Sequence, residues 1–184
     1  MNRITKKFGA RTALAIAVMG LSLSANAGFM RGAAAGAHGG FMSHGGGTLH
    51  TSAGQGGWHR RTVAGPSGHA SRWSGSKTDG QGNTTSATGS HWKGAEGAHG
   101  NTGTKLTQNA DGSSTLSHHT NSTNANGNTF NGQTNASKGA DGSVNATATR
   151  SDSNGFSANK SYSKDASGNA NASVTRLLND VRLD

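Results

Sequence analysis

Apolar and polar residues alternate with a period of two in several stretches of this chain. Between Ala140 and Gly155, in "ADGSVNATATRSDSNG", Val144, Ala146 and Ala148 are separated by Asn and Thr. A two-residue period is typical of a β-strand with one face more apolar than the other. The stretch begins with Asp-Gly and ends with Asn-Gly, which are turn signals. The pattern favours a strand between two turns, with a disordered linker as the alternative.

The turn signals recur at a regular distance. Triplets of the form Ala-x-Gly, with Glu, Asp or Asn at the centre, occupy 95–97, 110–112, 125–127 and 140–142, at steps of 15 residues. Related triplets follow at steps of 13. Asp-Gly and Asn-Gly are the preferred residues of type I′ hairpin turns. The glycines expected at the corners are Gly82, Gly97, Gly112, Gly127, Gly142, Gly155 and Gly168.

The repeat predicts an all-β architecture of turn-strand units of 13–15 residues over residues 63–172. Weaker glycines near the middle of several units suggest two short strands and two turns in each unit. A solenoid-like coil and a meander both fit this spacing. These central glycines are Gly75, Gly89, Gly103 and Gly132.

Large apolar residues are too few for an ordinary core. Of the 157 residues after Ala27, only 14 are Leu, Val or Phe and none is Ile. That share lies well below the roughly 20% under which globular folding becomes doubtful. The chain is therefore either largely disordered low-complexity sequence or a repetitive β structure whose order depends on stacking.

The two ends of the mature chain differ from the repeat. Residues 28–62 are rich in Gly and His, and this glycine density predicts a flexible arm. In residues 173–184, Val174, Leu177, Leu178 and Val181 follow a helical spacing. A short amphipathic C-terminal helix is expected there, with Ser173 as its N-cap.

The first 27 residues have the pattern of a secretory signal peptide. A basic start precedes an apolar run from Ala13 to Leu23, and Ala25-Asn26-Ala27 is an A-x-A cleavage site. No later apolar run approaches the roughly 18 residues of a membrane span. We expect export to the periplasm, the cell surface or the extracellular space, with no transmembrane segment after cleavage.

Charge and chemistry narrow the classes of function. Of the 17 Lys and Arg, four lie in the signal segment, so 13 face 8 acidic residues, a net charge of +5. This is too weak to predict specific nucleic-acid binding. The chain has no Cys, hence no disulfide framework. No nucleophile, paired acid or phosphate-loop arrangement predicts catalysis, and we expect no enzyme activity and no cofactor.

Two residue types are candidates for interactions. A His-rich tract can hold Cu²⁺, Ni²⁺ or Zn²⁺ weakly, and the candidate ligands are His38, His44, His50 and His59. Trp58, Trp73 and Trp92 each have basic neighbours, and such aromatics can stack on sugars or on other rings.

These observations favour an exported structural or interaction protein of a bacterial-type cell surface, extracellular matrix or biofilm. It would self-associate through stacked β repeats, as an amyloid-like or solenoid assembly, and contact extracellular polysaccharide or another matrix component. The composition is similar to that of secreted bacterial amyloid-forming matrix proteins. One alternative is an exported His-rich protein that binds metal or another surface ligand, and a second is a disordered, hydrophilic periplasmic protein.

Overall fold

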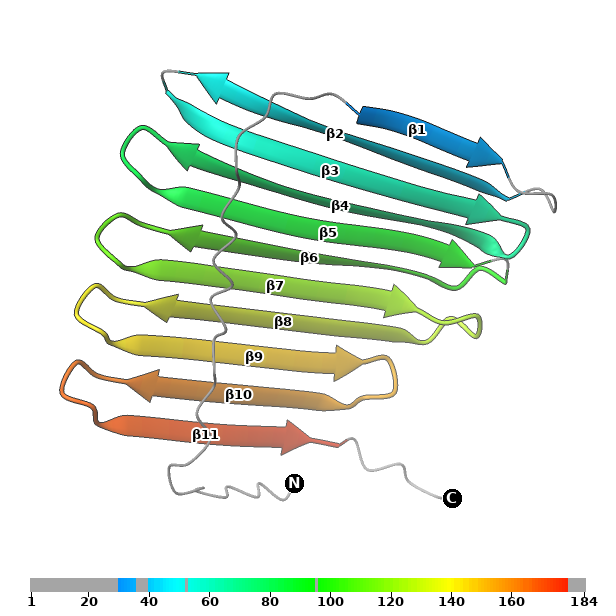
Figure 1. The fold of residues 1–184 in the computed structure, drawn as a ribbon. Helices are drawn as coiled ribbons and strands as arrows, with labels where there is room; N and C mark the ends of the chain where they lie inside the picture. The colour runs from blue at the N-terminus through cyan, green and yellow to red at the C-terminus, as the bar shows by residue number, and fades with distance from the viewer. Residues whose placement is uncertain (1–29, 36–39, 52, 95, 179–184) are drawn as a thin grey trace, which may run out of the picture.

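The described part of the chain forms one antiparallel sheet of eleven strands in sequence order (Figure 1). The computed structural model describes residues 30–35, 40–51, 53–94 and 96–178. The strands are β1 (Met30–Ala35), β2 (Phe41–Thr51), β3 (Gly54–Gly65), β4 (Gly68–Asp79), β5 (Thr84–Gly94), β6 (His99–Gln108), β7 (Ser114–Thr123), β8 (Thr129–Lys138), β9 (Val144–Asp152), β10 (Ser157–Lys164) and β11 (Ala170–Leu177). Each strand pairs with its neighbours in the chain, so the fold is a meander.

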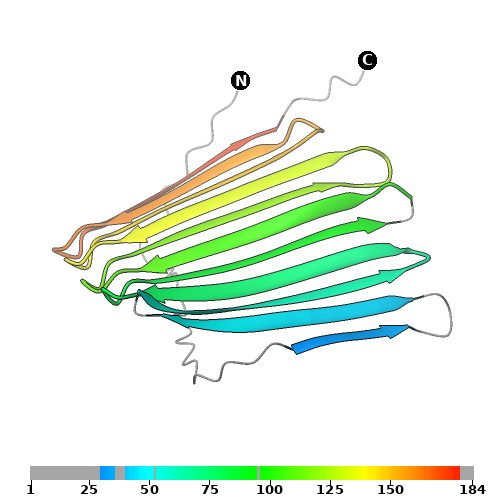
Figure 2. The same cartoon turned by 90° about the horizontal axis from the view of Figure 1, so that it is seen from above.

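The sheet is a single layer. In both views, no other described element packs against either face (Figures 1 and 2). Among the described residues the buried apolar side chains are those of Ala136 and Ala158, whereas Trp58 is 50% exposed and Leu49 67% exposed. The fold is therefore held mainly by backbone hydrogen bonds and by contacts between neighbouring strands within each face.

The expectation of a repetitive all-β structure is confirmed, and the meander is the form that the chain adopts. The expected division of each unit into two short strands is wrong. Each 15-residue unit contributes one ten-residue strand, such as β7 or β8, and one five-residue turn. The central glycines lie inside strands, as Gly89 does in β5.

The turns differ from the type I′ hairpins expected from the Asp-Gly and Asn-Gly pairs. In the turn after β6, the Asn109 N–H donates to the Ser113 carbonyl at 2.9 Å, and the Gly112 N–H donates to the Asn109 carbonyl at 3.0 Å. This pattern is a three-residue loop with glycine at its third position. Glycine alone has positive φ among the described residues, whereas a type I′ turn needs positive φ at both central residues.

Side chains at two positions of these turns tie the loop to its own backbone. At the residue just before the loop, Asn124 Oδ1 accepts the N–H groups of Asn126 and Asn128, both at 2.9 Å. At the second loop residue, Asp111 Oδ1 accepts the Ser113 N–H at 2.8 Å. These bonds satisfy backbone donors in the loop and explain why Asp and Asn recur there.

The Gly-rich arm expected over residues 28–62 is replaced by strands. Phe41–Thr51 forms β2, and Gly54–Gly65 forms β3. Glycine weakens a strand because it has no side chain to pack, but here neighbouring strands supply both the hydrogen bonds and the cover. The His59 ring, for example, reaches over Gly46.

The helix expected over residues 173–184 is also wrong in its first part, because Ala170–Leu177 is β11. A three-turn helix is marginal by itself, whereas β10 offers a complete row of backbone partners to β11. Residues 179–184, and the signal segment 1–27, lie outside the described residues. Over the part of the chain that the structure describes, no helix could cross a membrane.

Candidate interaction surfaces

The two faces of the sheet can be assigned residue by residue from the strand register. From β4 to β11, directly paired residues are both even or both odd, as Thr78 and Thr84 are. Paired residues project to the same face, so we name the two faces the even face and the odd face after the residues of β4–β11. The connections before and after β3 have two residues each, and across them an odd-numbered residue pairs with an even-numbered one, as Gly65 does with Gly68. The odd-numbered residues of β3 therefore lie on the even face.

The even face carries a row of apolar side chains that crosses six strands. Leu106 pairs with Leu116, which pairs with Ala136, and the same register continues to β11. We call this row the apolar ridge: Leu106, Leu116, Ala136, Ala146, Tyr162 and Ala172. It runs at right angles to the strands, and no described element covers it.

The odd face of β7–β11 is polar and almost free of charge. Its residues are Ser, Thr, Asn and Gln, apart from His119 and Leu177. Some of them bond across strands: Asn121 Nδ2 donates to Asn101 Oδ1 at 3.3 Å, and the Ser161 and Ser173 hydroxyls lie 2.7 Å apart. Such uncharged rows of small polar side chains are typical of surfaces on which sheets stack.

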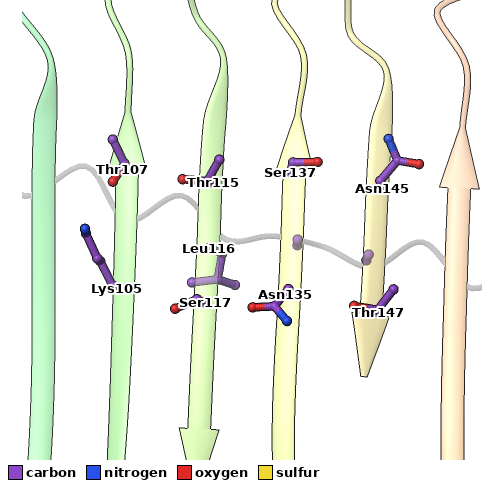
Figure 3. A pocket seen from close by; sticks show the side chains of 11 residues that line it. Lys105, Thr107, Thr115, Leu116, Ser117, Asn135, Ser137, Asn145 and Thr147 are labelled. Carbon is purple, nitrogen blue, oxygen red and sulfur yellow. The ribbon is translucent and has the colours of Figure 1, made fainter. Parts of the chain in front are cut away.

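A shallow open groove of about 480 Å³ crosses this polar surface (Figure 3). One wall consists of Thr107, Thr115, Ser137 and Asn145, and the other of Lys105, Ser117, Asn135 and Thr147. The floor includes Leu116, Ala136 and Ala146, whose side chains form the apolar ridge on the opposite face. The polar groove and the apolar ridge therefore follow the same line on opposite faces of the sheet.

Basic residues of the C-terminal half gather on the even face. Between residues 105 and 176 the chain has six Lys and Arg. Lys105 lies on the odd face, and the other five lie on the even face beside the apolar ridge: Lys138, Arg150, Lys160, Lys164 and Arg176. The polar surface of β7–β11 thus has no Lys, Arg, Asp or Glu.

The three tryptophans predicted as interaction residues do not form one cluster. Trp58 and Trp73 lie on the odd face, and Trp92 lies on the even face. Trp73 lies over Gly89 and Trp92 over Gly100, since a Cβ on either glycine would meet the indole. A glycine opposite a large ring gives the ring room to lie against the backbone.

A second groove, of about 460 Å³, lies on the even face of β3–β5. We call it the basic groove. Arg61 and Arg72, which are direct cross-strand partners, lie in it beside Val63, Ala70 and Trp92. His59, Ser74 and Ser90 also line it, and no Asp or Glu does. Trp92 was predicted as an interaction residue and the two arginines were not, because their pairing depends on the parity reversal at the two-residue connection before β4.

The histidines proposed as metal ligands are only partly placed by the structure. His44 and His50 lie in β2 and His59 in β3, while His38 lies outside the described residues. Elsewhere, the rings of His69 and His91 meet edge to face with centroids 5.4 Å apart. Within the described ranges, no three His, Cys, Asp or Glu residues are close enough together to hold a metal ion.

Hydrogen bonding lowers the pKa of four carboxyl groups, all in turns at the same end of the strands. The side chain and backbone of Asn83 lower the pKa of Asp79, and those of Asn169 lower the pKa of Asp165. Ser113 and Ser143 do the same for Asp111 and Asp141. These groups stabilise turns, and nothing in their surroundings assigns them catalytic chemistry.

Comparisons of the chain with protein-family models, with curated proteins and with solved structures found no match. Function is therefore inferred from the two faces of the sheet.

Proposed function

We propose that this chain is an exported structural protein of a bacterial-type cell surface or extracellular matrix, whose copies stack sheet upon sheet. The observation that carries the proposal is the single-layer sheet, with an apolar ridge on one face and a polar groove directly behind it. An amphipathic sheet normally buries its apolar face against a second layer. Here the second layer would be the next copy.

Charge decides how the copies face each other. Apposing two even faces would bring the five Lys and Arg beside the ridge close to the same residues of the next copy, and like charges repel. Apposing the even face of one copy and the odd face of β7–β11 of the next brings no such residues of the two copies together, apart from Lys105 of β6 at the edge of the groove. The long Lys and Arg side chains beside the ridge can extend their charged ends to water at the margin of the contact. This arrangement places the ridge of one copy in the groove of its neighbour.

The contact has the size of a stable interface. Five strands about 4.8 Å apart and about 30 Å long present roughly 700 Å² on each copy, close to the roughly 800 Å² per partner of standard protein interfaces. Because the two surfaces differ, the contact is heterologous and leaves a ridge and a groove free at the ends of each stack. Such contacts give open fibres when no rotation closes them.

Substitutions on the two faces test this arrangement. Leu116→Lys places a charge on the ridge, and Asn135→Lys places one in the groove. Either change should slow assembly at least about tenfold, because an unpaired charge is costly to bury. Gln55→Lys and Ala64→Lys, both in β3, add the same charge to the even and odd faces away from β7–β11, and serve as controls. Thioflavin fluorescence and sedimentation measure assembly.

A mixing experiment distinguishes the heterologous contact from a symmetric one. Copies with Leu116→Lys and copies with Asn135→Asp should assemble together faster than either does alone, since the lysine of one then faces the aspartate of the other. If Asn135→Lys assembled like the unchanged chain, or if mixing gave no gain, stacking of ridge into groove would be wrong.

A further inference from the structure

We propose that the basic groove on the even face of β3–β5 binds a linear acidic polysaccharide. Arg61 and Arg72 would bind carboxylates along one edge of the polymer, and Trp92 and Val63 would pack against its sugar rings. The choice of ligand rests on the proposed matrix role, but the groove is separate from the ridge and the polar groove used for stacking.

The two arginines form a like-charge pair whose repulsion a bound anion would remove. They are direct partners across β3 and β4, both are exposed, and no carboxylate lines the groove. Like charges directly opposite each other destabilise a sheet. The Arg61 guanidinium donates to Met42 Sδ at 3.5 Å, and a thioether is a weak acceptor. A carboxylate placed between the two guanidinium groups would accept charge-assisted hydrogen bonds and remove the repulsion.

An apolar row runs beside the cationic one. Across β2–β5, the consecutive partners are Met42, Val63, Ala70 and Trp92. Of these side chains, Met42 is 37% exposed, Val63 43% and Trp92 40%. Both rows cross the strands in steps of about 4.8 Å, which is close to the repeat of an extended pyranose chain. A polymer of uronic acids offers acid groups and the C–H faces of its rings at this spacing.

The composition of the groove favours an acidic polysaccharide over nucleic acid. Single-stranded nucleic acids stack successive bases on successive aromatic rings, whereas the rings that line this groove on the even face are those of Trp92 and His59. Trp73 also lines the groove, but its indole lies over Gly89 on the odd face. Two arginines also suit one carboxylate per sugar better than the dense charge of a phosphate backbone.

Calorimetry with oligogalacturonate of defined length tests the inference, using the chain that begins at Gly28 at a concentration where sedimentation shows no assembly. Arg61→Gln with Arg72→Gln should weaken binding at least about tenfold, the loss expected for two charge-assisted hydrogen bonds. Arg150→Gln with Arg176→Gln removes equal charge from the same face and should weaken binding less than about threefold. Arg61→Lys with Arg72→Lys keeps the charge and should restore part of the affinity. Circular dichroism confirms that each variant retains its β structure.

Three results would overturn the inference: no binding of oligogalacturonate, equal loss in the two glutamine pairs, or tighter binding of single-stranded DNA of the same charge. Assembly of the same variants separates this inference from the proposed function. Arg61→Gln with Arg72→Gln should assemble like the unchanged chain, so a failure of binding alongside normal assembly would count against the groove and leave the stacking proposal standing.

Discussion

At the scale of single residues, the turns show most directly how sequence determines conformation. Each of the seven corner glycines has φ between 81° and 94°. A side chain at this φ is strained by roughly 1–2 kcal/mol, which is why glycine recurs at this position. The Asp and Asn residues earlier in the turns have negative φ, and some of them, such as Asp111 and Asn124, accept backbone N–H groups with their side chains.

The turn carboxylates predict a specific dependence of stability on pH. The folded pKa values of Asp79, Asp111, Asp141 and Asp165 lie below the ordinary 3.8. Their ionised forms therefore stabilise the fold above this pH, and the contribution is lost as the pH falls through the folded values. The free energy of unfolding should change little with these groups from about pH 7 to 5 and should fall below about pH 4.

Asp79→Asn with Asp165→Asn provides the matched comparison. Asn124 occupies the equivalent turn position and accepts two backbone N–H groups, so the turns should persist while two titrating groups are lost. Urea unfolding at a series of pH values should show a shallower loss of stability in acid for this variant. The same acid dependence in both proteins would contradict the assignment.

At the scale of strands, cross-strand neighbours override local propensity. The glycine content of residues 28–62 predicted a flexible arm, and the spacing of Val174 and Leu177 predicted a helix, yet both regions contain strands. Both expectations considered the segment alone. In the sheet, each strand gains hydrogen bonds and side-chain contacts from its neighbours, and those contacts outweigh a weak preference for coil or for a short helix.

The pairing of Trp73 with Gly89 predicts a measurable coupling between the two positions. A Cβ at Gly89 would lie 2.6 Å from Cε2 and 2.8 Å from Cζ2 of the indole. Gly89→Ala should therefore destabilise the sheet by about 1–2 kcal/mol while Trp73 is present. In a Trp73→Ala background the same change should cost nearly nothing, because alanine suits a strand better than glycine.

Thermal or urea unfolding of the four proteins completes the cycle. Gly65→Ala is the control, since a Cβ there meets nothing within 4 Å. A coupling energy below about 0.5 kcal/mol would show that the indole does not depend on the glycine.

At the scale of the whole molecule, the repeat length determines which side chains share a face. The units of β5–β11 contain an odd number of residues, and each strand runs opposite to the one before. Removing two units, residues 114–143, joins Ser113 to Val144 and keeps the parity, so the remaining apolar residues stay on the even face. Removing one unit, residues 114–128, moves Ala136, Ala146 and Tyr162 to the odd face, whereas Leu106 stays on the even face.

We therefore expect the two-unit deletion to retain its β spectrum and to assemble, and the one-unit deletion to unfold at lower urea and to assemble more slowly. Circular dichroism, urea unfolding and thioflavin kinetics compare the two variants. Equal behaviour would show that the apolar ridge does not contribute to stability or to assembly.

The sequence by itself determined the positions of the turns, the spacing of the units and the β class, because glycine at positive φ, Asx side chains and two-residue alternation act within a few residues of the chain. It did not determine which residues share a face. That depends on register, and the two-residue connections around β3 reverse it, which is how Arg61 comes to lie beside Arg72. Only the tertiary structure showed that the apolar ridge and the polar groove lie back to back, because each is built from residues contributed by several strands.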